Sequence, residues 1–317
     1  MDSPASTDVT QHAAHLDDSA DLSPPPPMSL AAGLLRTARP RQWVKNVLVF
    51  SAPLAAGILT HDDVWWRLIA TFVAFCALSS GGYFVNDALD VERDRIHPKK
   101  RLRPIAAGVV SGSLALWTGA VLFVLGFALA GLINWRVLVI AVAYVVLTVS
   151  YSAWLKHEAV VEMVWLAGAF VLRAAAGGES VGVHLSPWFT VVISFGALLV
   201  VAGKRYAEQV ARGVSSVKTR EVLAQYPPGF LRFVWAMSAT ITVTGYCLWA
   251  LLPASGPVIP VPWPEISIVP FVVGILRYAM LLEAGSGEAP EDVFLRDRVL
   301  QLSGVVWVTI YVVGLYA

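Results

Sequence analysis

Apolar residues fall in long blocks along this chain, and short polar connections separate the blocks. Beyond residue 28 the blocks lie at roughly 43–59, 67–87, 113–131, 136–154, 160–178, 188–203, 231–252, 266–282 and 299–316. As helices, blocks of about 20 residues can cross the roughly 30 Å hydrocarbon layer of a membrane. Lipid offers no hydrogen-bond partners to backbone N–H and C=O groups, so a helix is the expected conformation of each block. The pattern therefore predicts an all-α polytopic membrane protein with about nine transmembrane helices.

The first 28 residues have a different character. They contain five Asp, no Lys or Arg, and an unbroken run of proline from Pro24 to Pro27. Such a segment cannot bury enough apolar surface to offset the entropy that ordering would cost. We therefore expect a disordered, acidic and proline-rich tail over residues 1–28, followed by a transmembrane domain over residues 29–317.

Composition and charge support a membrane protein and suggest its orientation. The chain is 57% hydrophobic and 14% charged, with a mean hydropathy of +0.66, whereas a soluble domain has about 25% charged residues. Of the 23 Lys and Arg residues, 18 lie in the N-terminal flank and in alternate connections, and the opposite side has only Arg67 and Arg136. Because positively charged loops stay in the cytoplasm, we expect the N-terminus and the charged loops there, in a plasma (inner) membrane.

The second apolar block ends in carboxylates. Read as a helix, Asp87, Asp90 and Asp94 are spaced i, i+3 and i+7 and share one face, with Asn86 beside them. A cluster of cations follows at once, in the run His97-Pro98-Lys99-Lys100-Arg101-Leu102-Arg103. Mg²⁺ prefers oxygen ligands shared between carboxylates and phosphates, and the remaining phosphate charge favours Lys and Arg. The segment therefore indicates a site for a polyphosphate carried with Mg²⁺.

A less specific explanation is that this charged segment only solvates a helix end. However, Asp87 and Asp90 end a membrane-length apolar run, where each charge costs about 2.5–3.5 kcal/mol if it stays at membrane depth. That cost favours a functional role. Further cations, with neighbouring polar groups, lie in the connections on the same predicted side of the membrane: Lys45, Asn46, Lys156, Lys204, Arg205, Tyr206, Arg296 and Arg298.

Several other chemistries are not indicated. Of the six histidines, only His12 and His15 are spaced i, i+3, and both lie in the tail that we expect to be disordered, so a helical zinc site is not indicated. Neither the GxxxxGK[ST] phosphate loop nor the GxSxG nucleophile motif is present. Cys76 and Cys247 both lie inside apolar blocks, so no disulfide or thiolate metal site is expected. The basic loops are too short for a nucleic-acid surface.

The motif Asn86-Asp87-x-x-Asp90-x-x-x-Asp94, closing a second predicted span, resembles the NDxxDxxxD signature of the UbiA superfamily of intramembrane prenyltransferases. That superfamily typically has a second aspartate-rich motif after its sixth span. Here that position holds Lys204-Arg205-Tyr206-Ala207-Glu208 instead. This difference, together with the motifs Arg39-Pro40-x-Gln42-Trp43-x-Lys45-Asn46 and Leu295-Arg296-Asp297-Arg298, is similar to the decaprenyl-phosphate phosphoribosyltransferase branch.

The resemblance implies a UbiA-like helical bundle whose active site lies at the cytoplasmic face. It also implies a Mg²⁺-dependent pentosyltransferase that moves 5-phosphoribose from phosphoribosyl diphosphate (PRPP) to decaprenyl phosphate, for arabinan (arabinogalactan) synthesis in the cell wall. The metal ligands and catalytic residues it implies are Asp87, Asp90 and Asp94. The substrate-binding residues it implies are Lys45, Asn46, Asn86, Lys100, Arg101, Arg103, Lys156, Lys204, Arg205, Tyr206, Arg296 and Arg298.

Two other functions stay open at this point. A UbiA-type enzyme could instead move a prenyl group from a prenyl diphosphate to an aromatic acceptor, although it would normally need the second aspartate motif. A membrane transporter would belong to another class and would predict discontinuous helices and internal repeats. The sequence leaves open the prenyl chain length, the number of Mg²⁺ ions and the oligomeric state, a homo-oligomer included.

Overall fold

The computed structural model describes residues 28–98, 100–212, 221–251, 261–285 and 290–316, all of them in helices, turns and irregular segments. Eight helices in this part of the chain are long and apolar enough to span a membrane. They are α3 (Asp62–Leu89), α5 (Gly112–Ile133), α6 (Trp135–Ala153), α7 (Val161–Ser180), α8 (Pro187–Arg212), α9 (Phe230–Leu251), α10 (Trp263–Glu283) and α12 (Arg298–Tyr316). They match the last eight predicted blocks, which confirms an all-α membrane protein. Residues 1–27, nearly all of the predicted tail, lie outside the described residues.

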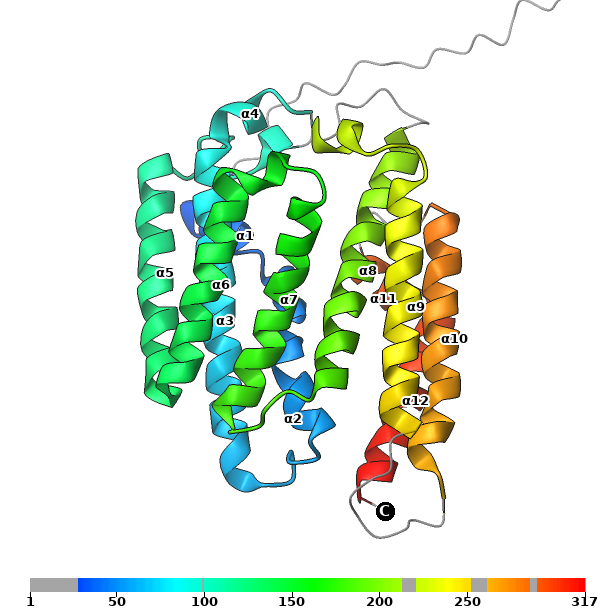
Figure 1. Ribbon diagram of the computed structural model, residues 1–317. Helices are drawn as coiled ribbons and strands as arrows, with labels where there is room; N and C mark the ends of the chain where they lie inside the picture. Colours follow the sequence, from blue (N-terminus) through cyan, green and yellow to red (C-terminus); the bar gives the residue numbers. More distant parts are fainter. Residues whose placement is uncertain (1–27, 99, 213–220, 252–260, 286–289, 317) are drawn as a thin grey trace, which may run out of the picture.

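The prediction of one continuous helix over residues 43–59 is wrong. A short helix α1 (Leu30–Ala38) comes first, and a 3₁₀ segment η1 (Pro40–Phe50) and the short helix α2 (Ser51–Ala55) follow it. Proline starts η1 and recurs in α2 as Pro53, which removes backbone donors that a continuous helix needs. Gly177 of α7 gives a second reason: a Cβ there would lie 1.7 Å from the Val49 carbonyl oxygen, so the backbone of η1 packs directly on α7. Figure 1 shows this irregular segment running along the inside of the bundle.

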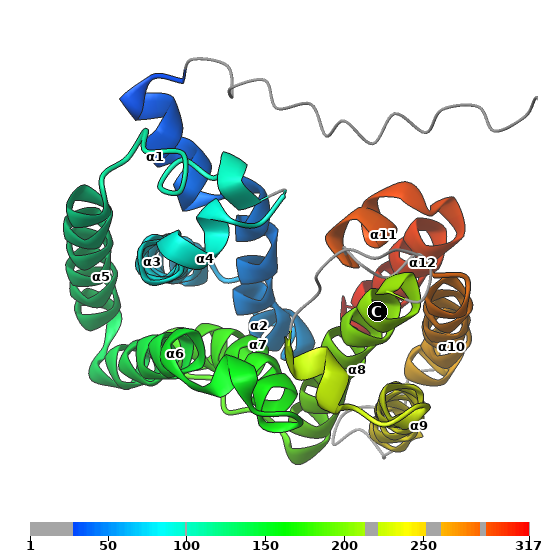
Figure 2. The same ribbon diagram turned by 90° about the horizontal axis from the view of Figure 1, so that it is seen from above.

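The helices form two groups that α7 joins. In one group α3 packs against α1, η1, α5 and α6, and in the other α8, α9, α10 and α12 pack in neighbouring pairs. Figure 2 shows the two groups standing side by side, with α3 inside the first. Phe75, Leu78 and Tyr144 are buried in the first group, and Leu199 and Leu231 are buried in the second. Each group therefore has its own packed interior.

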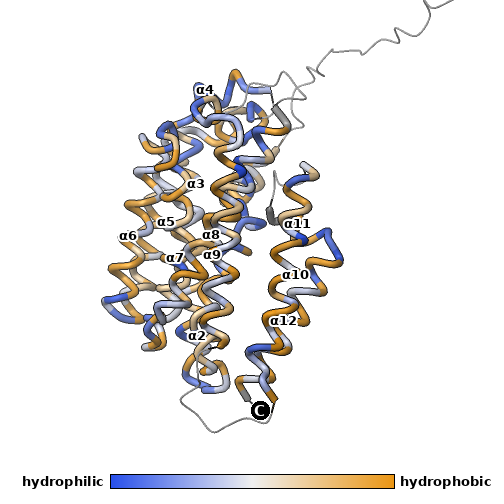
Figure 3. Tube along the Cα trace, turned by 45° about the vertical axis from the view of Figure 1, so that its right-hand side comes forward, coloured by the Kyte–Doolittle hydropathy of each residue, from blue (hydrophilic) through white to orange (hydrophobic). Residues whose placement is uncertain are grey.

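The outer surface of the bundle is apolar, as lipid requires. Large side chains such as Val124, Leu132 and Val269 are exposed on the long helices. Figure 3 shows hydrophobic residues along the lengths of the helices, whereas the region around α4 (Val91–Arg95) is largely hydrophilic. Exposed apolar surface of this extent is stable in lipid and would be an aggregation hazard in water. Lipid is therefore the solvent for the sides of the bundle.

Four of the short elements lie at one end of the bundle, the end where Figure 1 labels α4. They are α4, η2 (Lys100–Leu102), η3 (Leu155–His157) and η4 (Glu221–Gln225). Contacts join α4 to η2, and Gln225 of η4 donates a hydrogen bond to the carbonyl of His157 in η3. We call this end, defined by α4, η2, η3 and η4, the polar end.

Candidate functional site

The three predicted aspartates lie together at the polar end, on a helix that breaks between them. Asp87 is in the last turn of α3, Asp90 ends that helix, and Asp94 is in the short helix α4 that follows. The backbone N–H of Asp94 still donates to the carbonyl of Asp90, so the helical spacing survives the break. Asp87 and Asp94 are each only 2% exposed, and Asp90 is half-buried. The predicted common face is therefore present, turned into the protein.

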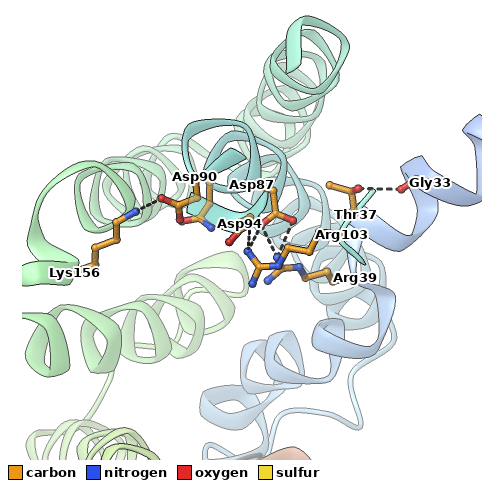
Figure 4. A network of polar contacts seen from close by, with 9 residues as sticks. Gly33, Thr37, Arg39, Asp87, Asp90, Asp94, Arg103 and Lys156 are labelled. Atoms are coloured by element: carbon orange, nitrogen blue, oxygen red, sulfur yellow. Dashed lines mark hydrogen bonds and ion pairs between the residues drawn. The ribbon is translucent and has the colours of Figure 1, made fainter. Parts of the chain in front are cut away.

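Each of these carboxylates is paired with a cation from another segment (Figure 4). Arg103 donates from one nitrogen to Asp87 at 3.1 Å and to Asp94 at 2.7 Å. Lys156, from η3, donates to Asp90 at 2.6 Å. Because one Arg103 nitrogen contacts both Asp87 and Asp94, these two carboxylates lie within two hydrogen-bond lengths of each other. The structure thus brings Arg103 and Lys156 to the three aspartates, although Lys156 lies 66 residues beyond Asp90 in the sequence.

Arg39 completes this group, and the list of binding residues predicted from the sequence left it out. Its Nη2 donates to both oxygens of Asp87, at 2.6 and 2.8 Å. Its guanidinium carbon also lies 4.7 Å from the ring centre of Tyr83, in a cation–π contact. The sequence does show Arg39 in a cluster of cations just before the first apolar block. No spacing rule, however, connects residue 39 to residue 87, so its contact with Asp87 could not be predicted.

Apolar packing holds the loop that carries Arg103. Ile105 and Val110 are buried with Phe84 of α3 in a small cluster. On the other side the loop touches α1 at Gly33, where a Cβ would lie 3.0 Å from a methyl carbon of Val109. The loop is therefore held between α1 and α3, and this packing positions Arg103 beside the aspartates.

The carboxylates suit a metal ion that arrives with phosphate. Mg²⁺ usually takes one or two carboxylates and completes its coordination with substrate phosphates and water. Asp87 and Asp94 are close enough to share an ion, and the side-chain amide of Asn86 lies 3.5 Å from Asp87. Within the described residues, no three His, Cys, Asp or Glu side chains form a ready-made metal cage. The donor set fits Mg²⁺ bound jointly with a ligand.

Asn46 lies away from this group, in the interior of the bundle. Its side chain is fully buried, and its Oδ1 accepts a hydrogen bond of 2.7 Å from Nε of Arg173. Its Nδ2 donates to Cys76 and Ser79 of α3. Both ends of the amide are therefore used in fixing η1 against α3 and α7. For this reason we leave Asn46 out of the binding residues proposed below.

Arg205 is enclosed by carboxylates. Its Nε and Nη2 donate to the two oxygens of Glu162 in α7, at 2.6 and 2.7 Å, and its Nη1 donates to Glu208 at 2.9 Å. Arg205 is 2% exposed and Glu162 is completely buried. Glu162 also accepts a hydrogen bond from the hydroxyl of Tyr226, whose pKa is raised by burial to about 12. A guanidinium paired in this way is a poor partner for a phosphate, so the geometry gives Arg205 a structural role.

The other predicted binding residues differ in how exposed they are and in what they contact. Lys45, Lys100, Arg101 and Lys204 are half-buried. Tyr206 is directed toward α9 and α10, where its ring packs on Trp235 and its hydroxyl donates to Glu283. Arg296 ends α11 (Pro290–Arg296), Arg298 starts α12, and both side chains are exposed.

Asp297, between those two arginines, has a clear structural role. It accepts hydrogen bonds from Arg277 of α10 and from the backbone N–H of Leu300 in the first turn of α12. The hydrogen bond from Arg277 is the main reason that the pKa of the Asp297 carboxyl is lowered. Asp297 therefore caps α12 and links it to α10, which fixes the backbone on both sides of Arg296 and Arg298.

Comparison with known proteins gives consistent matches. The family model of the UbiA prenyltransferase family matches residues 47–304. The decaprenyl-phosphate phosphoribosyltransferase of Corynebacterium glutamicum is 42% identical, over 92% of this chain and 89% of its own. The protein of the same name from Mycobacterium tuberculosis H37Rv is 44% identical, over 92% of this chain and 96% of its own. Among solved structures, a UbiA homolog from Archaeoglobus fulgidus bound to GPP and Mg²⁺ has the same fold, with a TM-score of 0.67 at 17% identity over 89% of this chain and 99% of that one.

Proposed function

This chain belongs to the UbiA prenyltransferase family, and from that premise we propose that it transfers 5-phosphoribose from PRPP to decaprenyl phosphate. The products would be decaprenylphosphoryl-5-phosphoribose and diphosphate, the former serving arabinan synthesis in the cell wall. The nearly full-length similarity to two decaprenyl-phosphate phosphoribosyltransferases supports this reaction over the prenylation of an aromatic acceptor. Formation of a lipid-extractable product from PRPP and decaprenyl phosphate, with release of diphosphate, is the reaction that tests the proposal.

The observation that carries the proposal is the pairing of aspartates with cations at the polar end. PRPP has a diphosphate at one end and a phosphate at the other, so its site needs metal-binding carboxylates and cations side by side. Asp87 and Asp94 supply carboxylates that could bind Mg²⁺, and Arg103 lies between them. Lys156 brings a further cation to the same place from η3. We assign the diphosphate of PRPP to this group.

The remaining cations divide between the 5-phosphate and the acceptor phosphate. In α8 the chain has Lys204 where relatives in the wider superfamily typically have acidic residues, and Arg205 beside it is neutralised by Glu162. Lys204 is therefore the cation of α8 that we assign to a substrate phosphate. Lys45 of η1 and Lys100 of η2 are further binding residues of the proposed site.

The proposed reaction exchanges one bond at C1 of the ribose. The bond from C1 to the diphosphate oxygen breaks, and an oxygen of the acceptor phosphate forms the new bond to C1. As in other glycosyl transfers, the charge in the transition state resembles an oxocarbenium ion. Mg²⁺, when bound with the donor, would offset charge on the departing diphosphate. Arg103 and Lys156 would bind that diphosphate and hold C1 toward the acceptor.

No general base is needed for this chemistry. The second pKa of a phosphate monoester is about 6, so the attacking oxygen is already largely ionised at neutral pH. The two described histidines at the polar end have other contacts: Nδ1 of His97 accepts a hydrogen bond from the backbone N–H of Lys100, and Nε2 of His157 lies 3.2 Å from Nη1 of Arg93. The chain's contribution is to bind two anionic substrates close together, which converts a bimolecular step into an effectively unimolecular one.

We further propose that the polar end faces the cytoplasm of a plasma (inner) membrane, with the N-terminus on the same side. PRPP is a charged, water-soluble donor, so its site has to open to the compartment that contains it. The uneven distribution of Lys and Arg supports the same orientation.

Cysteine labelling would measure this orientation. In a background without Cys76 and Cys247, a cysteine introduced as Ser215→Cys should be hidden from an impermeant thiol reagent in intact cells. A cysteine introduced as His184→Cys, at an exposed position between α7 and α8, should be labelled. After the membrane is permeabilised, both should react. Labelling of the first and protection of the second in intact cells would reverse the orientation and remove the proposed site from the cytoplasm.

A further inference from the structure

Arg39 occupies an unusual position in the chain. It ends α1 in the left-handed backbone region, with φ 53° and ψ 60°, and Pro40 follows at once. A non-glycine residue in that region has an unfavourable backbone conformation, which persists where the surroundings impose it. Here the hydroxyl of Ser80 in α3 donates to the carbonyl of Ala38, at 3.0 Å, and fixes the turn on α3. The fold thus places Arg39 over the end of α3 at an energetic cost.

At that position Arg39 and Arg103 share one carboxylate, that of Asp87. Asp87 accepts hydrogen bonds from both guanidinium groups, whereas Asp94 accepts only from Arg103 in the network of Figure 4. Asp87 is almost fully buried, but the side chain of Arg39 is 28% exposed. The Arg39 side chain is therefore partly accessible to a ligand from outside the protein, whereas the Asp87 carboxylate is not.

The charges of this group constrain how a metal could bind. Asp87, Asp90 and Asp94 are matched by Arg39, Arg103 and Lys156, so the group is close to neutral. A divalent cation alone would meet two guanidinium groups at Asp87 and would add uncompensated positive charge to a buried site. A diphosphate that arrives together with the cation removes both difficulties, because its oxygens offer the arginines new charge-assisted hydrogen bonds.

We propose that Arg39 is a substrate-binding residue that moves from Asp87 to the diphosphate, and that this exchange makes metal binding depend on the diphosphate. The inference rests on the proposed function only in taking a diphosphate as the ligand. Asp87 would then be available to Mg²⁺ only once the diphosphate has drawn Arg39 away. The enzyme would thus load metal and donor together, and the buried carboxylates would stay compensated before the donor arrives.

A binding measurement tests this without turnover. Mn²⁺, as a probe for Mg²⁺, is titrated into the full-length protein in detergent and followed by EPR, with and without inorganic diphosphate. In the wild type, diphosphate should tighten Mn²⁺ binding by a factor of about 5 to 150, the usual range of coupling between two sites. In Arg39→Gln, Mn²⁺ alone should bind more tightly than to the wild type, and the effect of diphosphate should shrink severalfold.

Two variants serve as controls. Arg39→Lys keeps the charge and should retain part of the coupling. Arg95→Gln removes an exposed arginine from α4 that pairs only with exposed Glu92 in the described contacts, and it should behave as the wild type. If Mn²⁺ alone binds Arg39→Gln no more tightly than the wild type, the exchange is refuted and Arg39 is purely structural. This outcome is independent of whether ribose is transferred, so it distinguishes failure of the inference from failure of the proposed function.

Discussion

Asp87→Asn is expected to lower kcat/KM for phosphoribosyl transfer by about 10³-fold, and Asp90→Asn should have a similar effect. Losing a metal ligand forfeits several kcal/mol of charge stabilisation in the transition state, and each 1.36 kcal/mol corresponds to about tenfold in rate. Asp94→Asn should also lower the rate strongly, because Asp94 is buried beside Asp87 and could share the same ion. Initial rates in detergent or proteoliposomes, at a series of Mg²⁺ concentrations, give these values.

The matched control for these variants is Glu92→Gln. Glu92 lies in α4 between Asp90 and Asp94, is 79% exposed, and pairs with Arg95 at the surface. Its replacement should leave both the rate and the Mg²⁺ dependence within about twofold, since exposed ion pairs contribute little. Thermal unfolding of each variant shows whether the protein is intact. If intact Asp87→Asn and Asp90→Asn proteins both keep near-normal rates, the aspartates are structural and the site lies elsewhere.

Breaking the buried pair between Glu162 and Arg205 is expected to have the largest effect on stability. Arg205→Ala should lower the free energy of unfolding by about 3–5 kcal/mol, because it leaves Glu162 as an uncompensated buried charge. Glu162→Ala should cost less, since Arg205 keeps its ion pair with Glu208. Replacing both with apolar residues, as Glu162→Leu with Arg205→Met, should recover much of the loss. Midpoints of thermal unfolding in detergent provide the comparison. A double variant no more stable than either single one would contradict this explanation.

The neighbouring Lys204 separates a structural effect from a binding effect. Lys204→Ala should weaken turnover with PRPP and decaprenyl phosphate while changing the unfolding midpoint less than Arg205→Ala does, because Lys204 is half-buried whereas Arg205 is buried. If Lys204→Ala keeps full activity, this position does not contact a substrate phosphate.

The hydrophobic pattern predicted the long helices well, because a membrane-length apolar block has few alternatives to a helix. The carboxylate motif was also readable, since its residues lie within two turns of one another. The prediction of one helix for the first block was wrong because its apolar residues form a broken segment: Pro53 interrupts it, and Gly177 of α7 lets its backbone pack closely. A hydropathy count contains no information on that packing.

Long-range pairing accounts for the other differences. Arg39 lies 48 residues before Asp87, and Glu162 lies 43 residues before Arg205, so neither contact follows from a local spacing. Lys204 and Arg205 look equivalent in the sequence, as two adjacent cations at the end of one helix. The buried carboxylate on α7 makes them different, because it neutralises the guanidinium that faces it.

The fate of the 5-phosphate of PRPP tests the central claim most directly. The purified protein is incubated with Mg²⁺, decaprenyl phosphate and PRPP carrying ³²P in its 5-phosphate, and the mixture is then extracted with organic solvent. We expect the label in the lipid phase, with unlabelled diphosphate released into water and no transfer when decaprenyl phosphate is omitted. If the label stays in water, while a prenyl diphosphate and an aromatic acid give a prenylated ring, the protein is an aromatic prenyltransferase and the proposed reaction is wrong.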